Sequence, residues 1–286
     1  MDMIRDSFSL QVGAGAFVCM GFHALRLLTD GFFTKLAAKF GAKSETECQK
    51  FGMQALNFMF HLAAGAFAAM VVRNEGWLRH PELVWAGNYR EIPSLYVAFY
   101  CVEFGYHLQR LVALFFKERK KDFTEMLIHH VVTIALIATS FAKGYTRIGI
   151  MVMMVHDTSD ILGCLAKMAN AVNQKQLLIG IFFPMFMTWF YTRLWILPMH
   201  IVPISAHHHS SGVEGTATRF CTICLCILVV LHAYWFSLFM RMLHRVVVSK
   251  GKVAEDIQED SKSKHSSREV KGSDPFTSPP CMGPTP

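Results

Sequence analysis

The sequence predicts an all-α, polytopic membrane protein with about seven transmembrane helices. Of its 286 residues, 52% are apolar and only 17% are charged, whereas a soluble domain carries about 25% charged residues. Apolar runs of roughly 20 residues recur along the chain, which is the length that an α-helix needs to cross about 30 Å of hydrocarbon. These segments must be helical, because hydrocarbon offers no water to satisfy the backbone polar groups.

The apolar runs define seven expected spans. They cover residues 8–28, 52–72, 93–116, 125–142, 146–169, 177–202 and 220–242. The first run carries His23 and several glycines, and it lacks the short apolar core and small-residue cleavage pattern of a removable signal peptide. We therefore expect it to stay in the protein as the first helix of an N-terminal segment, residues 1–49.

Basic residues alternate between successive loops. The segments after the first, third, fifth and seventh spans are rich in Lys and Arg, and the intervening loops are poorer. Because cytoplasmic loops carry an excess of these residues, we expect a lumenal N-terminus and a cytosolic C-terminus. Residues 246–286 are polar and charged with few aromatics, so we expect a disordered cytosolic tail. The Ser/Gly-rich segment 203–219 is expected to be a flexible loop that leaves His207, His208 and His209 in solvent rather than on a metal.

Ionisable residues lie inside the fourth and fifth spans. His129 and His130 occur near the start of the fourth. His156, Asp157 and Asp160 are spaced so that they share one face of the fifth. Such residues are costly in hydrocarbon and mark functional sites. Since the two spans run antiparallel, we expect both groups at similar depth in the cytosolic half of the membrane, with one histidine facing Asp160.

This combination of residues suits acyl transfer from a thioester to an amine. A neutral imidazole can act as a general base or a nucleophile. A buried carboxylate beside it fixes the tautomer and stabilises the charged form, while a second carboxylate can hold a proton or bind an amine. Two alternatives stay open: a His–Asp pair that only joins two helices, and a zinc or iron site. The H-E-x-x-H and repeated H-x-x-H-H motifs of metal sites are absent from the sequence.

Five motifs occur in a fixed order across these spans. They are Lys121-Asp122-Phe123, His129-His130, Arg147-Ile148-Gly149, H-D-x-x-D at 156–160, and Lys167-Met168-Ala169-Asn170. In order and spacing they resemble the signature of the ceramide synthases, in the TLC-domain superfamily. Flanking matches are Tyr100, Glu103, Thr192-Arg193-Leu194, Pro198 and Trp235-Phe236. The resemblance covers about residues 50–245, which would form a six-helix TLC core.

The resemblance implies that the protein is an enzyme of sphingolipid biosynthesis in the endoplasmic reticulum membrane. The implied reaction transfers a fatty acyl group from acyl-CoA to the amine of sphinganine or sphingosine, with no cofactor and no metal. His129 and His130 match the family's essential histidine pair, and Asp157 and Asp160 match its essential aspartates. One histidine would carry the acyl group, and we favour His129. Cys164 stands where many family members carry Glu.

Six further residues are candidates for binding substrate. They are His156, Arg193, Glu103, Lys120, Lys121 and Lys167. The basic run 117–121 either marks a cytosolic loop or holds the phosphates of CoA. We expect Arg193 to pair with a carboxylate such as Glu103, or to line the substrate cavity.

Other functions remain open at this stage. A non-enzymatic TLC-domain protein would bind, sense or transport lipid, with structural histidines. A channel or proton-coupled transporter would use the polar stripe as a relay. The expected partners are acyl-CoA, the sphingoid base and membrane lipids, with a homo- or heterodimer as a further option and no nucleic acid.

Overall fold

The computed structural model describes residues 2–116, 122–210 and 215–248, and within them it contains helices but no β-strand. The elements are α1 (Asp2–Lys39), α2 (Glu45–Glu75), the 3₁₀-helix η1 (Pro81–Val84), α3 (Ser94–Phe115), α4 (Phe123–Ala142), α5 (Thr146–Ala171), α6 (Lys175–Trp189), the π-helix η2 (Phe190–Ile201), α7 (Val202–Ser210) and α8 (Gly215–Val248). The expected all-α class is therefore confirmed.

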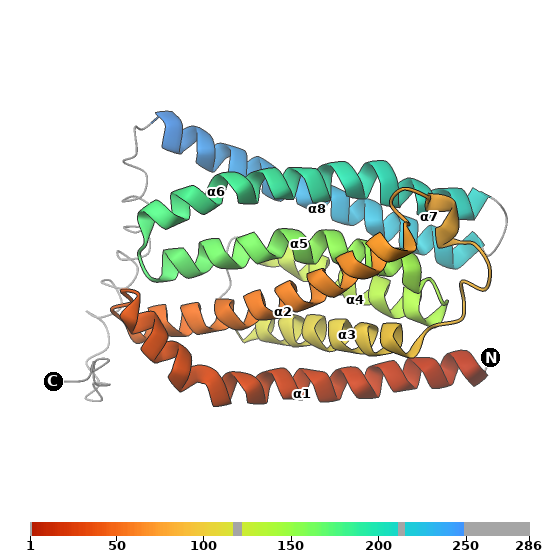
Figure 1. The fold of residues 1–286 in the computed structure, drawn as a ribbon, viewed down its shortest axis with the longest axis horizontal. Coiled ribbons are helices and arrows are strands. Elements are labelled where there is room, and N and C mark those ends of the chain that lie inside the picture. The colour runs from red at the N-terminus through yellow and green to blue at the C-terminus, as the bar shows by residue number, and fades with distance from the viewer. Residues whose placement is uncertain (1, 117–121, 211–214, 249–286) are drawn as a thin grey trace.

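The long helices lie side by side and alternate in direction, as Figure 1 shows. α1 begins at the right end of the view and α8 ends at the left. α6, η2 and α7 follow one another without a break and form one long rod. The α1–α2 and α5–α6 turns lie at the left end, whereas η1 and α7 lie at the right end. The α1–α2 and α5–α6 turns, which belong to two of the basic segments predicted to be cytosolic, therefore share the left end.

Six helical segments of the described chain are long and apolar enough to cross a membrane. They are Gln11–Lys39, Glu45–Glu75, Phe123–Ala142, Thr146–Ala171, Lys175–His207 and Gly215–His244. The chain is thus a multi-pass membrane protein. The remaining expected span, 93–116, forms α3, which has 22 residues and lies in the bundle beside α1. α3 carries Glu103, His107 and Arg110, which lower its hydropathy below that of the six.

The N-terminal half of the expected loop 203–219 is helical instead. Residues 203–210 continue the preceding rod as α7, so the prediction of a loop is wrong for this part. Pro203 is the second residue of α7, inside the continuous rod, and it has no backbone N–H to donate there. The π-helix before it contains Pro198, whose ring cannot donate the backbone hydrogen bond of a regular helix. Residues 249–286 of the expected tail lie outside the described chain.

α5 occupies the centre of the bundle and packs closely against α2. Glycine makes the closest approach possible: a Cβ added at Gly65 of α2 would lie 3.2 Å from the Cβ of Asp157 on α5. A Cβ added at Gly149 of α5 would overlap the hydroxyl of Tyr100 on α3. Small residues at such crossings let helix backbones approach within a membrane. They bring the ionisable residues of α5 within reach of the neighbouring helices.

Candidate active site

A cavity runs through the bundle between α3, α4, α5 and α8, and one end of it is strongly polar. The empty space between its lining side chains, open mouth included, is about 790 Å³. Its ionisable lining residues are Glu103, His107, His129, His156, Asp157 and Asp160. Three of the four predicted catalytic residues thus face one cavity.

The rest of the cavity is a long apolar channel. Its walls include Leu136, Ile137, Ile148, Val152, Met153, Leu225 and Leu228, and its far end includes Trp85, Tyr145, Ser205 and Thr218. The lining residues of α5 run from Ile148 to Asp160, a helical length of about 18 Å. This is close to the thickness of one hydrocarbon leaflet, about 15 Å. A polar end on a channel of this length suits an amphiphile with one long chain.

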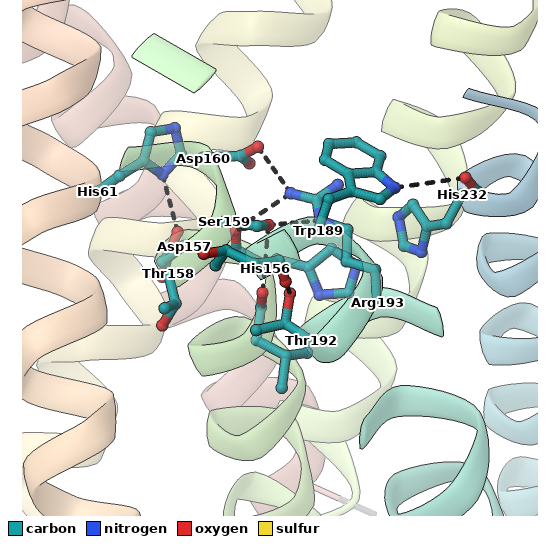
Figure 2. Close-up of polar contacts among 12 residues, drawn as sticks. His61, His156, Asp157, Thr158, Ser159, Asp160, Trp189, Thr192, Arg193 and His232 are labelled. Carbon is teal, nitrogen blue, oxygen red and sulfur yellow. Dashed lines mark hydrogen bonds and ion pairs between the residues drawn. The ribbon is translucent and has the colours of Figure 1, made fainter. Parts of the chain in front are cut away.

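Asp157 is held by a buried hydrogen-bonded chain. Its Oδ1 lies 2.8 Å from Nδ1 of His61 on α2, and Nε2 of His61 lies 3.0 Å from the Tyr106 hydroxyl on α3. A carboxylate only accepts, so His61 Nδ1 donates to Asp157 and the tyrosine hydroxyl donates to Nε2. All three residues are buried. The Asp157 side chain also lies within hydrogen-bonding reach of the Glu103 carboxyl group on α3. Figure 2 shows His61 and Asp157 meeting across the α2–α5 contact.

Asp160 is paired with Arg193 of η2. The guanidinium NH2 lies 2.7 Å from Asp160 Oδ1, and the same group donates to the His156 backbone carbonyl at 3.1 Å. Arg193 Nε donates to the Ser159 hydroxyl at 2.6 Å. The guanidinium also lies over the Trp189 ring, 4.1 Å from its centre. These contacts hold the Arg193 guanidinium in place. They also join η2 to the part of α5 that carries the catalytic candidates.

Two histidines present their rings to the cavity. His156 Nδ1 lies 2.7 Å from the Val152 carbonyl, which can only accept, so Nδ1 carries the proton and Nε2 of the neutral ring has a free lone pair. His156 Nε2 and His129 Nδ1 have no hydrogen-bond partner among the described residues. The His156 and His129 rings both pack against His232 of α8, with centroids 4.9 and 6.1 Å apart respectively. These nitrogens are available to a substrate.

One sequence-based expectation about these residues is wrong, because Asp160 pairs with Arg193 rather than facing His129 or His130. Arg193 pairs with a carboxylate as expected, and that carboxylate is Asp160 rather than Glu103. Although they line one cavity, His156, Asp157 and Asp160 contact three different helices, α8, α2 and η2. α5 lies at the centre of the bundle, so side chains on this one face of α5 contact several neighbouring helices. The histidine that Asp157 orients is His61.

The remaining predicted residues occupy different places. His130 is buried but does not line the cavity. Glu103 is buried at the polar end, with Oε2 3.6 Å from Nε2 of His107. Lys167 is exposed on α5 and is not part of the lining. Lys120 and Lys121 lie outside the described residues.

Sequence reasoning missed several polar residues of this site. They are His61, Tyr106, His107 and His232. Each lies inside an apolar run, so the rule that ionisable residues in hydrocarbon mark a site would have found the histidines. Within the described residues, no three His, Cys, Asp or Glu side chains are grouped as metal ligands.

The chain resembles characterised proteins along most of its length. A family model described as the TLC domain matches residues 50–241. Human (Homo sapiens) ceramide synthase 4 is 33% identical over 226 residues, which cover 78% of this chain and 57% of the human protein. The chain thus spans little more than half the length of that relative.

Two plant proteins align over a larger share of their own length. Alternaria stem canker resistance protein 1 of Solanum lycopersicum is 29% identical over 276 residues, covering 86% of this chain and 89% of the tomato protein. Ceramide synthase LOH2 of Arabidopsis thaliana is 29% identical over 212 residues, covering 71% of each. Because the TLC domain model matches well over half of its residues, the chain belongs to the TLC domain family.

Proposed function

We propose that this protein is a ceramide synthase that transfers a fatty acyl group from acyl-CoA to the amine of a sphingoid base. The observation that carries the proposal is the cavity, in which imidazole nitrogens without protein partners lie at the polar end of an apolar channel. The channel accommodates an acyl chain, and the polar end holds the reacting carbonyl. The relatives named ceramide synthase support the same chemistry.

In the proposed reaction, His129 is the nucleophile. Its lone-pair ring nitrogen attacks the thioester carbonyl, the carbon–sulfur bond breaks, and CoA leaves as the thiol with the proton from the other ring nitrogen of His129. The sphingoid amine then attacks the acyl-imidazole, an amide bond forms, and the imidazole is released. His156 Nε2, with its free lone pair, accepts the proton that the amine loses. His130 belongs to the same motif but is buried outside the lining, so we assign it a supporting role.

The carboxylates take two different roles. Asp160 lines the cavity with 36% of its side chain exposed while one oxygen pairs with Arg193, so its other oxygen can receive the ammonium of the incoming base. Asp157 is held by His61 and Tyr106, and it keeps the negative potential of the site near the reacting groups. Glu103 and His107 complete the polar wall.

We further propose that the protein resides in the endoplasmic reticulum membrane with its N-terminus lumenal and its C-terminus cytosolic. The basic segments at the left end of Figure 1 favour this orientation. The polar end of the cavity lies on the side of α5 that leads to this end, because Asp160 follows Ile148 in the direction of Ala171. Acyl-CoA would therefore arrive from the cytosol, where Lys120, Lys121 and Lys167 favour its phosphates.

The test is product formation by the purified protein. It is incubated with sphinganine and acyl-CoAs of several chain lengths, and both the ceramide and the free CoA are measured by mass spectrometry. We expect equal amounts of the two products. Retention of lipid without release of CoA would contradict the proposal and favour the non-enzymatic lipid-binding alternative.

A further inference from the structure

A second cleft lies between α1, α2 and α3, apart from the candidate active site. Its polar lining consists of Arg26, Asn57, Gln109 and Arg110, and its apolar lining includes Phe22 and Leu56. The space between the lining side chains is about 430 Å³. A cleft with cations on an apolar wall is suited to a ligand that combines negative charge with hydrocarbon.

The two arginines face this cleft from different helices, Arg26 from α1 and Arg110 from α3. Both are half-buried. Among the described residues, no carboxylate oxygen lies within the 4.0 Å ion-pair distance of either guanidinium. An arginine in a membrane-spanning bundle is costly unless it pairs or reaches the interface. Its planar fork matches a phosphate, and Asn57 and Gln109 supply further hydrogen-bond donors.

The cleft lies toward the end of the bundle that holds the α1–α2 and α5–α6 turns. Arg110 precedes the last residue of α3, Phe115, by five positions, which is about 8 Å along the helix. In Figure 1 this end of α3 points to the left, toward the α1–α2 turn. Arg110 therefore lies less than two turns from the end of α3.

Aromatic side chains close the space between this cleft and the main cavity. The Tyr106 ring stacks on Phe60 with centroids 3.7 Å apart, and Phe22 packs edge-on against both at 5.5 Å. Behind them, the Tyr106 hydroxyl is bonded to His61. The cleft and the main cavity are lined by different residues of the described chain. This separates the ligand of the cleft from the acyl donor of the proposed reaction.

We propose that the cleft binds an anionic phospholipid, whose phosphate lies between Arg26 and Arg110 and whose chain lies along the apolar wall. The lipid shares Tyr106 with the hydrogen-bonded chain that ends at Asp157, so bound lipid supports one wall of the candidate site. The binding claim does not depend on the proposed acyltransferase function.

The test measures which lipid stays with the protein. The full chain is reconstituted in nanodiscs containing equal amounts of phosphatidylglycerol and phosphatidylcholine, then released and analysed by native mass spectrometry. We expect wild type to retain phosphatidylglycerol preferentially. The double variant Arg26→Gln/Arg110→Gln should lower that retention about tenfold or more, since a charge-assisted hydrogen bond contributes about 1.5–3 kcal/mol. Lys35→Gln, which removes an exposed cation of α1, is the matched control and should retain the lipid.

Three results would overturn the inference. They are equal retention of the two lipids by wild type, unchanged retention by the double variant, and an equal loss with Lys35→Gln. Displacement of the lipid by free CoA would show that the phosphate source is the substrate and would also overturn it. If the Gln variants fail to fold, Arg26→Lys/Arg110→Lys keeps both charges, and it must retain part of the preference.

Discussion

At the residue scale, the site separates side chains that are fixed from side chains that are available. Asp157 and Asp160 are each engaged through one oxygen, by His61 and by Arg193. His129 and His156 keep ring nitrogens without protein partners at the cavity. The fixed groups thus hold charge in place, while the available ones can exchange protons or bonds with a substrate. Substituting a fixed residue and substituting an available residue should therefore affect activity in different ways.

Removing the Tyr106 hydroxyl tests the hydrogen-bonded chain without changing its shape. Tyr106→Phe leaves His61 Nε2 without its donor, so the hold on Asp157 weakens. We expect kcat to fall about tenfold with little change in KM, because the substrate contacts remain, and stability to fall by about 1 kcal/mol. Steady-state kinetics with the proposed substrates measures both constants. A purely structural role would lower the yield of folded protein and leave kcat unchanged.

Arg193→Lys tests the other fixed contact. Lysine keeps the positive charge but cannot contact Asp160, Ser159 and the Trp189 face together. We expect activity to fall about 10- to 100-fold, and thermal unfolding in detergent to occur at a lower temperature. Arg79→Lys, at an exposed position in the segment after α2, is the control. Wild-type activity in Arg193→Lys would show that charge alone suffices.

At the element scale, the α2–α5 contact decides whether the site forms. The Gly65 backbone lies so close to Asp157 that an added Cβ would approach the Asp157 Cβ to 3.2 Å. The π-helix η2 contacts another side of α5. It carries Arg193, which pairs with Asp160. Such wide turns occur often at functional sites in helices. α5 is therefore positioned between two specialised contacts.

Gly65→Leu should separate α2 from α5. A leucine side chain must displace the Asp157 backbone region, so we expect a loss of about 1–3 kcal/mol of stability together with loss of activity. Gly163→Leu is the matched control on α5, because no heavy atom lies within 4 Å of a Cβ added there. Thermal unfolding and product formation are measured for both variants. Equal effects of the two substitutions would contradict the role given to the contact.

At the scale of the whole molecule, the bundle encloses a channel about as long as one leaflet. Its far end is bordered by Trp85, Tyr145, Ser205 and Thr218. A bulky residue inside the channel should limit the acyl chain that fits, whereas one on the lipid-facing surface should not. The cavity therefore predicts where acyl-chain selection takes place.

Leu225→Trp and Ile223→Trp test this on a single helix. Leu225 lines the cavity and is 2% exposed, whereas Ile223 of the same helix is 59% exposed. We expect Leu225→Trp to shift the products toward shorter acyl chains and Ile223→Trp to leave their distribution unchanged. Retained activity on the shortest acyl-CoA shows that the variant is folded. An unchanged distribution with Leu225→Trp would place selection elsewhere.

The sequence predicted the helices better than it predicted their contacts. Length and apolarity are local properties, so each of the seven expected spans coincides with a helical segment of the described chain. The pairing of His61 with Asp157 joins residues 96 positions apart, and it depends on which helices are neighbours. For the same reason, the sequence predicted that Arg193 pairs with a carboxylate but did not identify Asp160 as that partner. The catalytic roles of His129, His130, Asp157 and Asp160 remain predictions.

One measurement tests the central claim, that the histidine site transfers an acyl group to an amine. Purified wild type, His129→Ala and the control His80→Ala are incubated with labelled acyl-CoA and sphinganine; His80 is an exposed histidine directly before η1. We expect labelled ceramide from wild type and His80→Ala, and a loss of at least about 100-fold with His129→Ala. Absence of ceramide from folded wild type, or full activity of His129→Ala, would contradict the account.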